Sequence, residues 1–322
     1  MFRNCMLAIG VVLGLGLAPT EAQETQLVRM GTASLAGVYF PVGVAVCRLS
    51  NADRLEHGIR CAALPSEGSV ANIGALRAGD VEMAIVQSDI QAAALEGSGT
   101  FADAGPFGDL RAVMALHTEP LTVVAQADGG IDGLDGLQGA RLGQGPEGSG
   151  DRALWQRVVD QLGWTETTFA ETTVLAPGDQ AQALCTDAVD AFVYAVGHPA
   201  QSVREATLTC DAHLVPVAGP AIDTLVASSR YYSDTQIAGG LYQGNPDPVP
   251  SFGVGATLVA RADVPEDTVY TIVATALERI EMLRGLNPVL ADLDPERMAT
   301  AGLTAQLHPG AARAFRERGA IE

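Results

Sequence analysis

The sequence predicts an α/β protein with two lobes, and three observations support this prediction. Short apolar segments alternate with longer amphipathic segments through nearly the whole chain, a pattern typical of strands and helices in layers. A strand, a loop of small residues and a helix follow one another at least four times. Residues 23–322 are more than one hydrophobic core usually organises, so two domains are expected.

The first α/β unit is expected to contain three strands, each followed by a helix. The strands are at residues 27–30, 59–64 and 83–86, and the helices at 38–51, 70–76 and 89–96. Pro41 falls in the first turn of the first helix, where a missing N–H is tolerated. Gly79 ends the second helix.

The rest of the chain continues this alternation. Strands are expected at residues 110–116, 121–125, 140–142, 191–195, 214–217 and 254–260. The spacing of apolar residues predicts one helix after residue 150 and one that starts at Asp179 and ends before Val189. It also predicts a long helix over 267–284 and a terminal helix over 310–318. Residues 239–253 are rich in Gly and Pro and indicate a crossover or a flap.

The N-terminus predicts export. Arg3 precedes an apolar run over residues 6–18, and small residues at Thr20 and Ala22 frame a cleavage site. We therefore expect a cleavable signal peptide at residues 1–22 and a periplasmic mature protein. The alternative is an N-terminal membrane anchor, but the apolar run is shorter than the roughly 20 residues that span a bilayer.

Four cysteines follow the predicted cleavage site: Cys47, Cys61, Cys185 and Cys210. An even number of cysteines in an oxidising compartment indicates disulfides. Cys47–Cys61 and Cys185–Cys210 are the simplest pairs because each closes a local loop, although four cysteines allow three connectivities. Metal binding is disfavoured because no C-x-x-C motif or histidine cluster accompanies them.

The charge excludes several classes of function. A net charge of −19 and a pI near 4.5 make nucleic acid and anionic membranes poor partners. All 19 basic residues are arginines, so lysine-dependent catalysis and a P-loop lysine are excluded. Arginine binds carboxylates with two parallel hydrogen bonds. The sequence leaves open whether Arg111, Arg141, Arg152 or none of them contacts a ligand.

Loops at the ends of predicted strands are the candidate binding site. They deliver backbone N–H groups at helix starts, which bind anions through free donors and the helix dipole. In parallel sheets the carboxyl edge of the strands is where ligands bind. The loop residues singled out here are Thr32, Ser34, Ser66, Ser69, Gln87, Ser88, Asp89, Gly148 and Ser149.

Other motifs are weaker. Gly143-x-Gly145-x-x-Gly148 matches a dinucleotide fingerprint, but its late position and the export signal favour a carboxylate-binding helix start. His198 follows the predicted strand at 191–195, which includes Tyr194, and either contacts ligand or is structural. Tyr39 has the same two interpretations. No catalytic elbow or metal motif occurs, so we expect neither an enzyme nor a cofactor.

Six segments resemble the TAXI-type solute-binding proteins of TRAP transporters. They lie, in order along the chain, at residues 31–43, 67–72, 84–89, 119–121, 145–150 and 307–313. The resemblance covers nearly all of the predicted mature chain. It implies a type II periplasmic-binding-protein fold, with two α/β lobes and a ligand cleft between them. The expected division is 23–118 plus 226–322 for lobe 1 and 119–225 for lobe 2.

The resemblance also implies a function. The protein is expected to capture glutamate, 2-oxoglutarate or a related small carboxylate or amino acid, as a monomer, and to deliver it to a membrane permease. The family's loop residues fall on Ser34, Ser66, Ser69 and the trio Gln87, Ser88 and Asp89, and Glu119 lies in a matching segment. An exported sensor that presents bound solute to a receptor kinase is the alternative, and an enzyme on this fold is a third hypothesis.

This sequence departs from the family pattern in two loops. Ala33, Leu35 and Ala36 replace residues that are usually Gly or Thr, which makes the first loop bulkier and more apolar. Glu67 stands where glycine is expected. If Glu67 faces the cleft, it disfavours a second ligand carboxylate and favours an ammonium group; the alternative is that Glu67 points to solvent.

Overall fold

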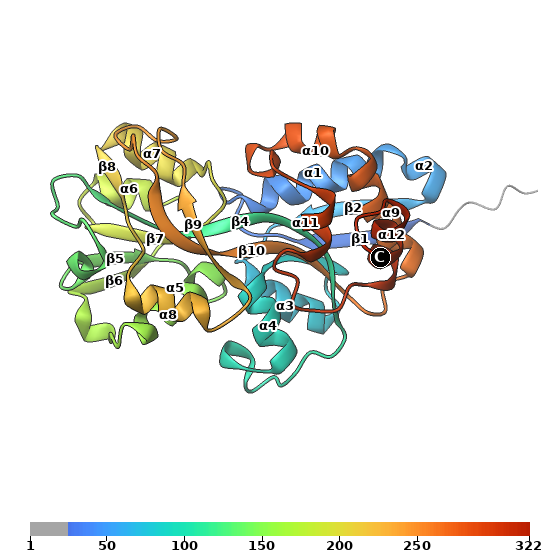
Figure 1. Ribbon diagram of the computed structural model, residues 1–322, viewed down its shortest axis with the longest axis horizontal. Helices are drawn as coiled ribbons and strands as arrows, with labels where there is room; N and C mark the ends of the chain where they lie inside the picture. The colour runs from blue at the N-terminus through green and yellow to red at the C-terminus, as the bar shows by residue number, and fades with distance from the viewer. Residues whose placement is uncertain (1–24) are drawn as a thin grey trace, which may run out of the picture.

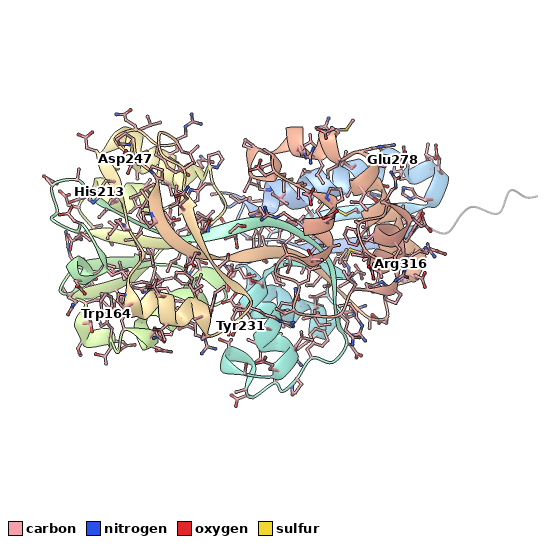
Figure 2. The ribbon with its side chains drawn as sticks, in the orientation of Figure 1. Trp164, His213, Tyr231, Asp247, Glu278 and Arg316 are labelled. Carbon is pink, nitrogen blue, oxygen red and sulfur yellow. A yellow bond between two sulfur atoms is a disulfide. The ribbon has the colours of Figure 1, made fainter. Side chains whose placement is uncertain are left out.

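The computed structural model describes residues 25–322 as two α/β lobes joined by long strands (Figure 1). The predicted α/β class and two-lobed architecture are confirmed. The predicted signal peptide lies outside the described residues. No helix within residues 25–322 is both long and apolar enough to cross a bilayer. Figure 2 labels Glu278 and Arg316 on the first lobe, Trp164, His213 and Asp247 on the second, and Tyr231 near their junction.

The first lobe begins with three parallel strands in the order β2-β1-β3. They are β1 (Gln26–Gly31), β2 (Ile59–Leu64) and β3 (Met83–Gln87). The helices that follow them are α1 (Tyr39–Ala52), α2 (Arg54–His57), α3 (Ser69–Ala78) and α4 (Ser88–Glu96). Each of the three longer helices therefore starts at the carboxyl edge of the sheet, as the sequence predicts.

The second lobe repeats this layout around β5 (Arg141–Gln144), β6 (Glu171–Val174), β7 (Ala191–Ala195) and β8 (Ala212–Val215). Its helices are α5 (Gly150–Gln161), α6 (Gln180–Cys185), α7 (Gln201–Thr209) and α8 (Pro220–Ala227). Strand β5 pairs in parallel with β6 and β7, so the loop after β5 opens toward the first lobe. Trp155 of α5 packs edge-on against Trp164 in this lobe's core.

Two antiparallel strands, β4 (Leu110–Gln126) and β10 (Val249–Arg261), run through both lobes. The prediction of two strands at 110–116 and 121–125 is wrong, because residues 117–120 pair with β10 and continue the strand. Two register shifts, where β4 has one residue more than β10, let this long pair bend. Met114 of β4 belongs to the first-lobe core, whereas Leu121 belongs to the second-lobe core.

The C-terminal third departs from the prediction in two places. Strand β10 begins at Val249 rather than residue 254, and β9 (Tyr232–Ile237) pairs with it. The helix predicted over 267–284 is divided at Arg279 into α9 (Glu266–Glu278) and α10 (Ile280–Leu286). After α11 (Pro295–Thr300), the terminal helix α12 (Pro309–Glu317) packs on α9, close to its predicted position.

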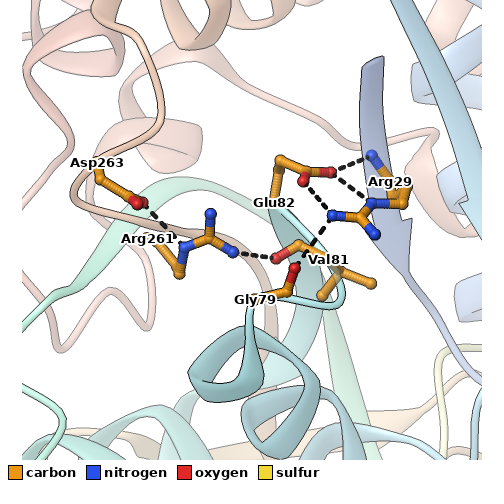
Figure 3. Close-up of polar contacts among 6 residues, drawn as sticks. All are labelled: Arg29, Gly79, Val81, Glu82, Arg261 and Asp263. Carbon is orange, nitrogen blue, oxygen red and sulfur yellow. Dashed lines mark hydrogen bonds and ion pairs between the residues drawn. The ribbon is translucent and has the colours of Figure 1, made fainter.

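Disulfides and ion pairs stabilise each lobe. The disulfides are Cys47–Cys61, between α1 and β2, and Cys185–Cys210, between the ends of α6 and α7, so the favoured pairing is confirmed. At the far end of the first sheet, Arg29 binds Glu82 at 2.6 Å (Figure 3). Arg261 of β10 donates to the carbonyl of Val81 at 2.9 Å. These contacts tie β1 and β10 to the turn before β3.

Candidate ligand-binding site

A cavity of about 300 Å³ lies between the lobes, where the loops after β1, β2 and β3 face those after β5, β6 and β7. Its polar lining consists of Ser34, Tyr39, Ser66, Glu67, Ser69, Gln87, Glu119, Ser149, Asp151 and Tyr194. Its apolar lining includes Val38, Pro146, Val174, Pro177 and Val196. The cavity therefore combines a few convergent polar groups with apolar walls, as small-molecule sites commonly do.

Asn72 holds the first-lobe loops in place. Its side-chain amide is buried and donates to the carbonyls of Thr32, at 2.7 Å, and Ile85, at 2.8 Å. Its Oδ1 accepts a hydrogen bond from the hydroxyl of Ser66 at 2.8 Å. One side chain thus fixes the ends of β1 and β3 and the loop after β2. The cavity wall is rigid because buried hydrogen-bonding groups are costly to separate.

The lobes contact each other at one edge of the cavity. The backbone N–H of Ala71 in α3 donates to the carbonyl of Gly148 at 3.1 Å. A Cβ at Gly150 would lie 2.1 Å from Oε1 of Gln87, so only glycine allows this approach of α5 to the first lobe. On the opposite side, a Cβ at Gly178 would lie 3.5 Å from the Cβ of Ala36. The structure is therefore a closed arrangement of the two lobes.

The buried carboxylate of Glu119 forms the floor of the cavity. Its Oε2 accepts hydrogen bonds from the Tyr39 hydroxyl at 2.7 Å and from Nε2 of Gln87 at 3.2 Å. Its Oε1 lies 3.6 Å from Nε2 of His117, a buried ring behind the floor. Burial, with the charge of Glu119 beside it, holds the pKa of Tyr39 well above its usual range. Tyr39 is therefore a permanent donor to this carboxylate.

A second carboxylate, Asp151, lines the cavity from the first turn of α5. Burial raises the pKa of Asp151 to about 6, and the charge of Glu119 adds to the rise. Burial likewise raises the pKa of Tyr194 well above its usual range, with Asp151 and Glu119 contributing. Two carboxylates and two neutral phenols thus face one small space. This arrangement favours bound cations over bound anions.

Nine of the fourteen predicted site residues line this cavity: Ser34, Tyr39, Ser66, Glu67, Ser69, Gln87, Glu119, Ser149 and Tyr194. Glu67 is exposed, lines the cavity and lies against Gly148. Of the carboxylates that line the cavity, that of Glu67 is exposed and that of Glu119 is buried.

The other five predicted residues lie elsewhere. Thr32 donates to the carbonyl of Leu64, and Ser88 donates to the carbonyl of Tyr231. Asp89 faces a separate cavity of about 210 Å³ that also includes Arg157. Gly148 contributes its carbonyl to the contact between the lobes. His198 is half-buried and lines another cavity, of about 590 Å³, with its ring between Thr122 and Tyr242.

His198 follows β7, but its two nitrogens are already engaged. Nε2 lies 2.9 Å from the hydroxyl of Thr122, and Nδ1 lies 2.6 Å from the hydroxyl of Tyr242. Burial lowers the pKa of His198 to about 4, so the ring is neutral at ordinary pH. The Tyr242 hydroxyl also accepts from the N–H of Ala200. Both ring nitrogens therefore have hydrogen-bonding partners within the protein.

None of the three candidate arginines lines the cavity. Arg141 forms an ion pair with Asp190 at 2.5 Å, and Arg111 donates to backbone carbonyls of Gly108 and Leu110.

Sequence reasoning missed Asp151, because an acidic residue in a first helical turn is normally explained by the helix dipole. Nor does any group of three or more His, Cys, Asp or Glu within residues 25–322 have a metal-binding arrangement.

Comparison with known proteins agrees with this architecture. The chain resembles the ligand-binding component of an ABC-type import system from Staphylococcus aureus, solved with zinc, with a TM-score of 0.50 and 12% identity. That alignment covers 91% of this chain and 84% of the other. It also resembles a Xanthomonas citri protein bound to ATP, with a TM-score of 0.50 and 14% identity, over 92% of this chain and 100% of the other.

At these identities the structural likenesses establish the fold and nothing finer. The sequence itself matches the model of the NMT1-like family over residues 30–319, from the end of β1 to just beyond α12. This range includes every loop that forms the cavity and both strands that join the lobes. The chain belongs to the NMT1-like family.

Proposed function

We propose that this protein is the periplasmic solute-binding receptor of a TAXI-type TRAP transporter, which captures a small carboxylate or amino acid and delivers it to the membrane permease. The observation that carries the proposal is the cavity between the two lobes, closed at one edge by the Ala71–Gly148 hydrogen bond. A solute bound there is enclosed on both sides. The six segments that resemble TAXI proteins support the assignment to a TRAP transporter. The two disulfides are typical of an exported protein.

Capture would work by closure of the lobes around the solute. We place the bend in β4 and β10, near residues 117–120 and 253–256, where the chain passes between the two cores. Lobe 1 is then residues 23–118 with a C-terminal part, and lobe 2 begins at residue 119. Tyr232 and Ile237 pack in the second-lobe cores, which supports moving β9 with lobe 2 rather than with lobe 1.

The cavity lining favours one of the solutes that the resemblance implies. The starts of α1 and α3 offer N–H groups suited to one carboxylate. A second carboxylate would lie close to Glu119 and Asp151, where like charges repel strongly in a dry site. Glutamate, which carries an ammonium group, therefore fits better than 2-oxoglutarate or another dicarboxylate.

Thermal denaturation of refolded, solute-free protein tests the proposal. A solute at 100 times its Kd stabilises the folded state by about 2.7 kcal/mol, so the melting temperature rises. We expect a rise with glutamate and a smaller one with 2-oxoglutarate or succinate. No shift with any amino acid, keto acid or dicarboxylate, confirmed by calorimetric titration, would count against a solute receptor. Binding without permease-dependent uptake would instead support the sensor role.

A further inference from the structure

We infer that the floor of this cavity is a subsite for a positively charged nitrogen of the solute, formed by Glu119, Asp151 and Oε1 of Gln87. The inference rests on the proposed solute-binding function and adds the chemical class of the solute, an aliphatic amine. It does not follow from the resemblance, whose implied solutes include dicarboxylates without any amine. Its support is the geometry of the cavity floor.

Gln87 presents a buried acceptor that has no partner. The residue is 2% exposed and lines the cavity, and its Oε1 accepts no hydrogen bond from any residue in the described part of the chain. Its orientation is fixed because Nε2 donates to Oε2 of Glu119 at 3.2 Å. Rotating the amide would place its oxygen against that carboxylate. A donor on the solute would satisfy this oxygen, because a buried acceptor without a partner is destabilising.

Glu119 has acceptor capacity left as well. Tyr39 and Gln87 both donate to Oε2, whereas the nearest partner of Oε1 is His117, whose Nε2 lies 3.6 Å away and beyond a good hydrogen bond. The side chain of Glu119 is 4% exposed and lines the cavity, so a solute there can supply the missing donors. Tyr39 and Gln87 hold the carboxylate in one orientation, which makes it a preformed acceptor.

The charges of the lining point to a cation. Three carboxylates line the cavity, those of Glu67, Glu119 and Asp151, and no arginine or histidine is among the lining residues. The chain contains no lysine at all. An ammonium group brings three donors and one positive charge, which matches a set of acceptors on Glu119, Asp151 and Gln87. A carboxylate placed on this floor would meet like charges and no donor to offset them.

The remaining walls suit an aliphatic chain attached to that nitrogen. Val38, Val174 and Val196 face the cavity, together with the rings of Pro146 and Pro177. Apolar contact with these residues stabilises methylene groups by removing them from water. We therefore assign a solute that has an ammonium group at the floor and a short aliphatic chain along the valine and proline walls.

A charge series on one carbon skeleton tests the assignment. Solute-free protein is titrated by calorimetry with 1,4-diaminobutane, 4-aminobutanoate and succinate, which share four carbons and differ in charge. We expect both amines to bind and succinate to bind at least tenfold more weakly. Titrations at 0.5 M NaCl separate cavity binding from attraction to the acidic surface, because exposed charges are screened and buried pairs much less so.

Matched variants locate the subsite. Glu119→Gln keeps the size of the side chain and removes its charge, so affinity for both amines should fall at least tenfold. Glu205→Gln removes an exposed charge on α7, away from the cavity, and should change affinity less than threefold. Circular dichroism melting confirms that each variant is folded. Equal binding of amines to the wild type and to Glu119→Gln would overturn the subsite.

The outcomes separate the two proposals. Binding of succinate or 2-oxoglutarate without any binding of amines overturns the ammonium subsite but retains the solute-receptor function. The absence of binding by every probe, amine and carboxylate alike, overturns both. Binding of amines that is lost in Glu119→Gln and kept in Glu205→Gln supports both.

Discussion

At the scale of single residues, the buried polar groups separate into those with partners and those without. Asn72 satisfies all its hydrogen-bonding groups and fixes three loops. Asp89, 7% exposed, has an Oδ1 without a partner among the described residues, although Arg157 lines the same small cavity. Burial raises the pKa of Asp89 to about 7, opposed by backbone hydrogen bonds and by Arg157 and reinforced by Glu119. The ionised form of Asp89 therefore lowers the free energy of unfolding.

Replacing this carboxylate should therefore stabilise the protein at high pH. The pKa of Asp89 in the folded state lies above its ordinary value of 3.8, so the folded state holds this proton more tightly than the unfolded state. Stability from this group is present below pH 4 and is lost as the pH rises toward 7. We expect the advantage of Asp89→Asn over the wild type to grow by about 3 kcal/mol between pH 5 and pH 8.

Urea unfolding at the two pH values measures this difference. Asp103→Asn, which removes an exposed carboxylate, is the matched control and should show an advantage that does not change with pH. A pH-independent difference for Asp89→Asn would show that its carboxylate titrates normally.

At the scale of elements, the sequence predicted the first-lobe strands and helices well because each lies on a clear apolar or helical pattern. The short strand β6 was not predicted because Glu171–Val174 is polar and lies at the edge of the sheet, where only pairing with β5 makes it a strand. β9 was missed for the same reason, since its pairing with β10 defines it. Neither pairing has a local sequence signal.

The two disulfides should contribute unequally to stability. Cys47 and Cys61 are each 4% exposed and belong to the first-lobe core, whereas Cys185 and Cys210 are only partly buried. Loops of 14 and 25 residues each predict about 3 kcal/mol from chain entropy alone. We expect Cys47→Ala/Cys61→Ala to lose more unfolding free energy than Cys185→Ala/Cys210→Ala, because it also leaves a cavity in the core.

Urea denaturation of both double variants measures the difference. Wild-type protein in which both disulfides have been reduced serves as the reference for the loss of both bonds. Solute affinity of the Cys185→Ala/Cys210→Ala variant should match the wild type, since neither cysteine lines the cavity. A larger loss in that variant would contradict the expected order.

At the scale of the whole molecule, closure depends on how near α5 comes to the first lobe. Gly150 permits this approach, because a Cβ there would lie 2.1 Å from Oε1 of Gln87 and 2.8 Å from Oγ of Ser69. Both of these atoms belong to buried residues that cannot easily move aside. Gly150 is therefore a determinant of the closed state rather than of either lobe's fold.

Gly150→Ala should hold the lobes apart and weaken binding. We expect at least a tenfold loss of affinity for glutamate and, by small-angle X-ray scattering, a radius of gyration that no longer decreases when glutamate is added. Gly74→Ala, in an open position on α3 with no atom within 4 Å of the added Cβ, is the control and should behave as the wild type. Normal compaction of Gly150→Ala would show that closure does not need this contact.

The sequence by itself determined the alternation of strands and helices, the small-residue loops at strand ends and the absence of lysine. These are local properties, fixed by spacing and composition. Only the tertiary structure decided that β4 is one strand and that Glu119, Gln87 and Asp151 share one cavity. Tyr39 and Glu119 are 80 residues apart, so their hydrogen bond exists only after both lobes fold. The negative charge of the cavity arises because residues from both lobes meet there, and no single loop specifies it.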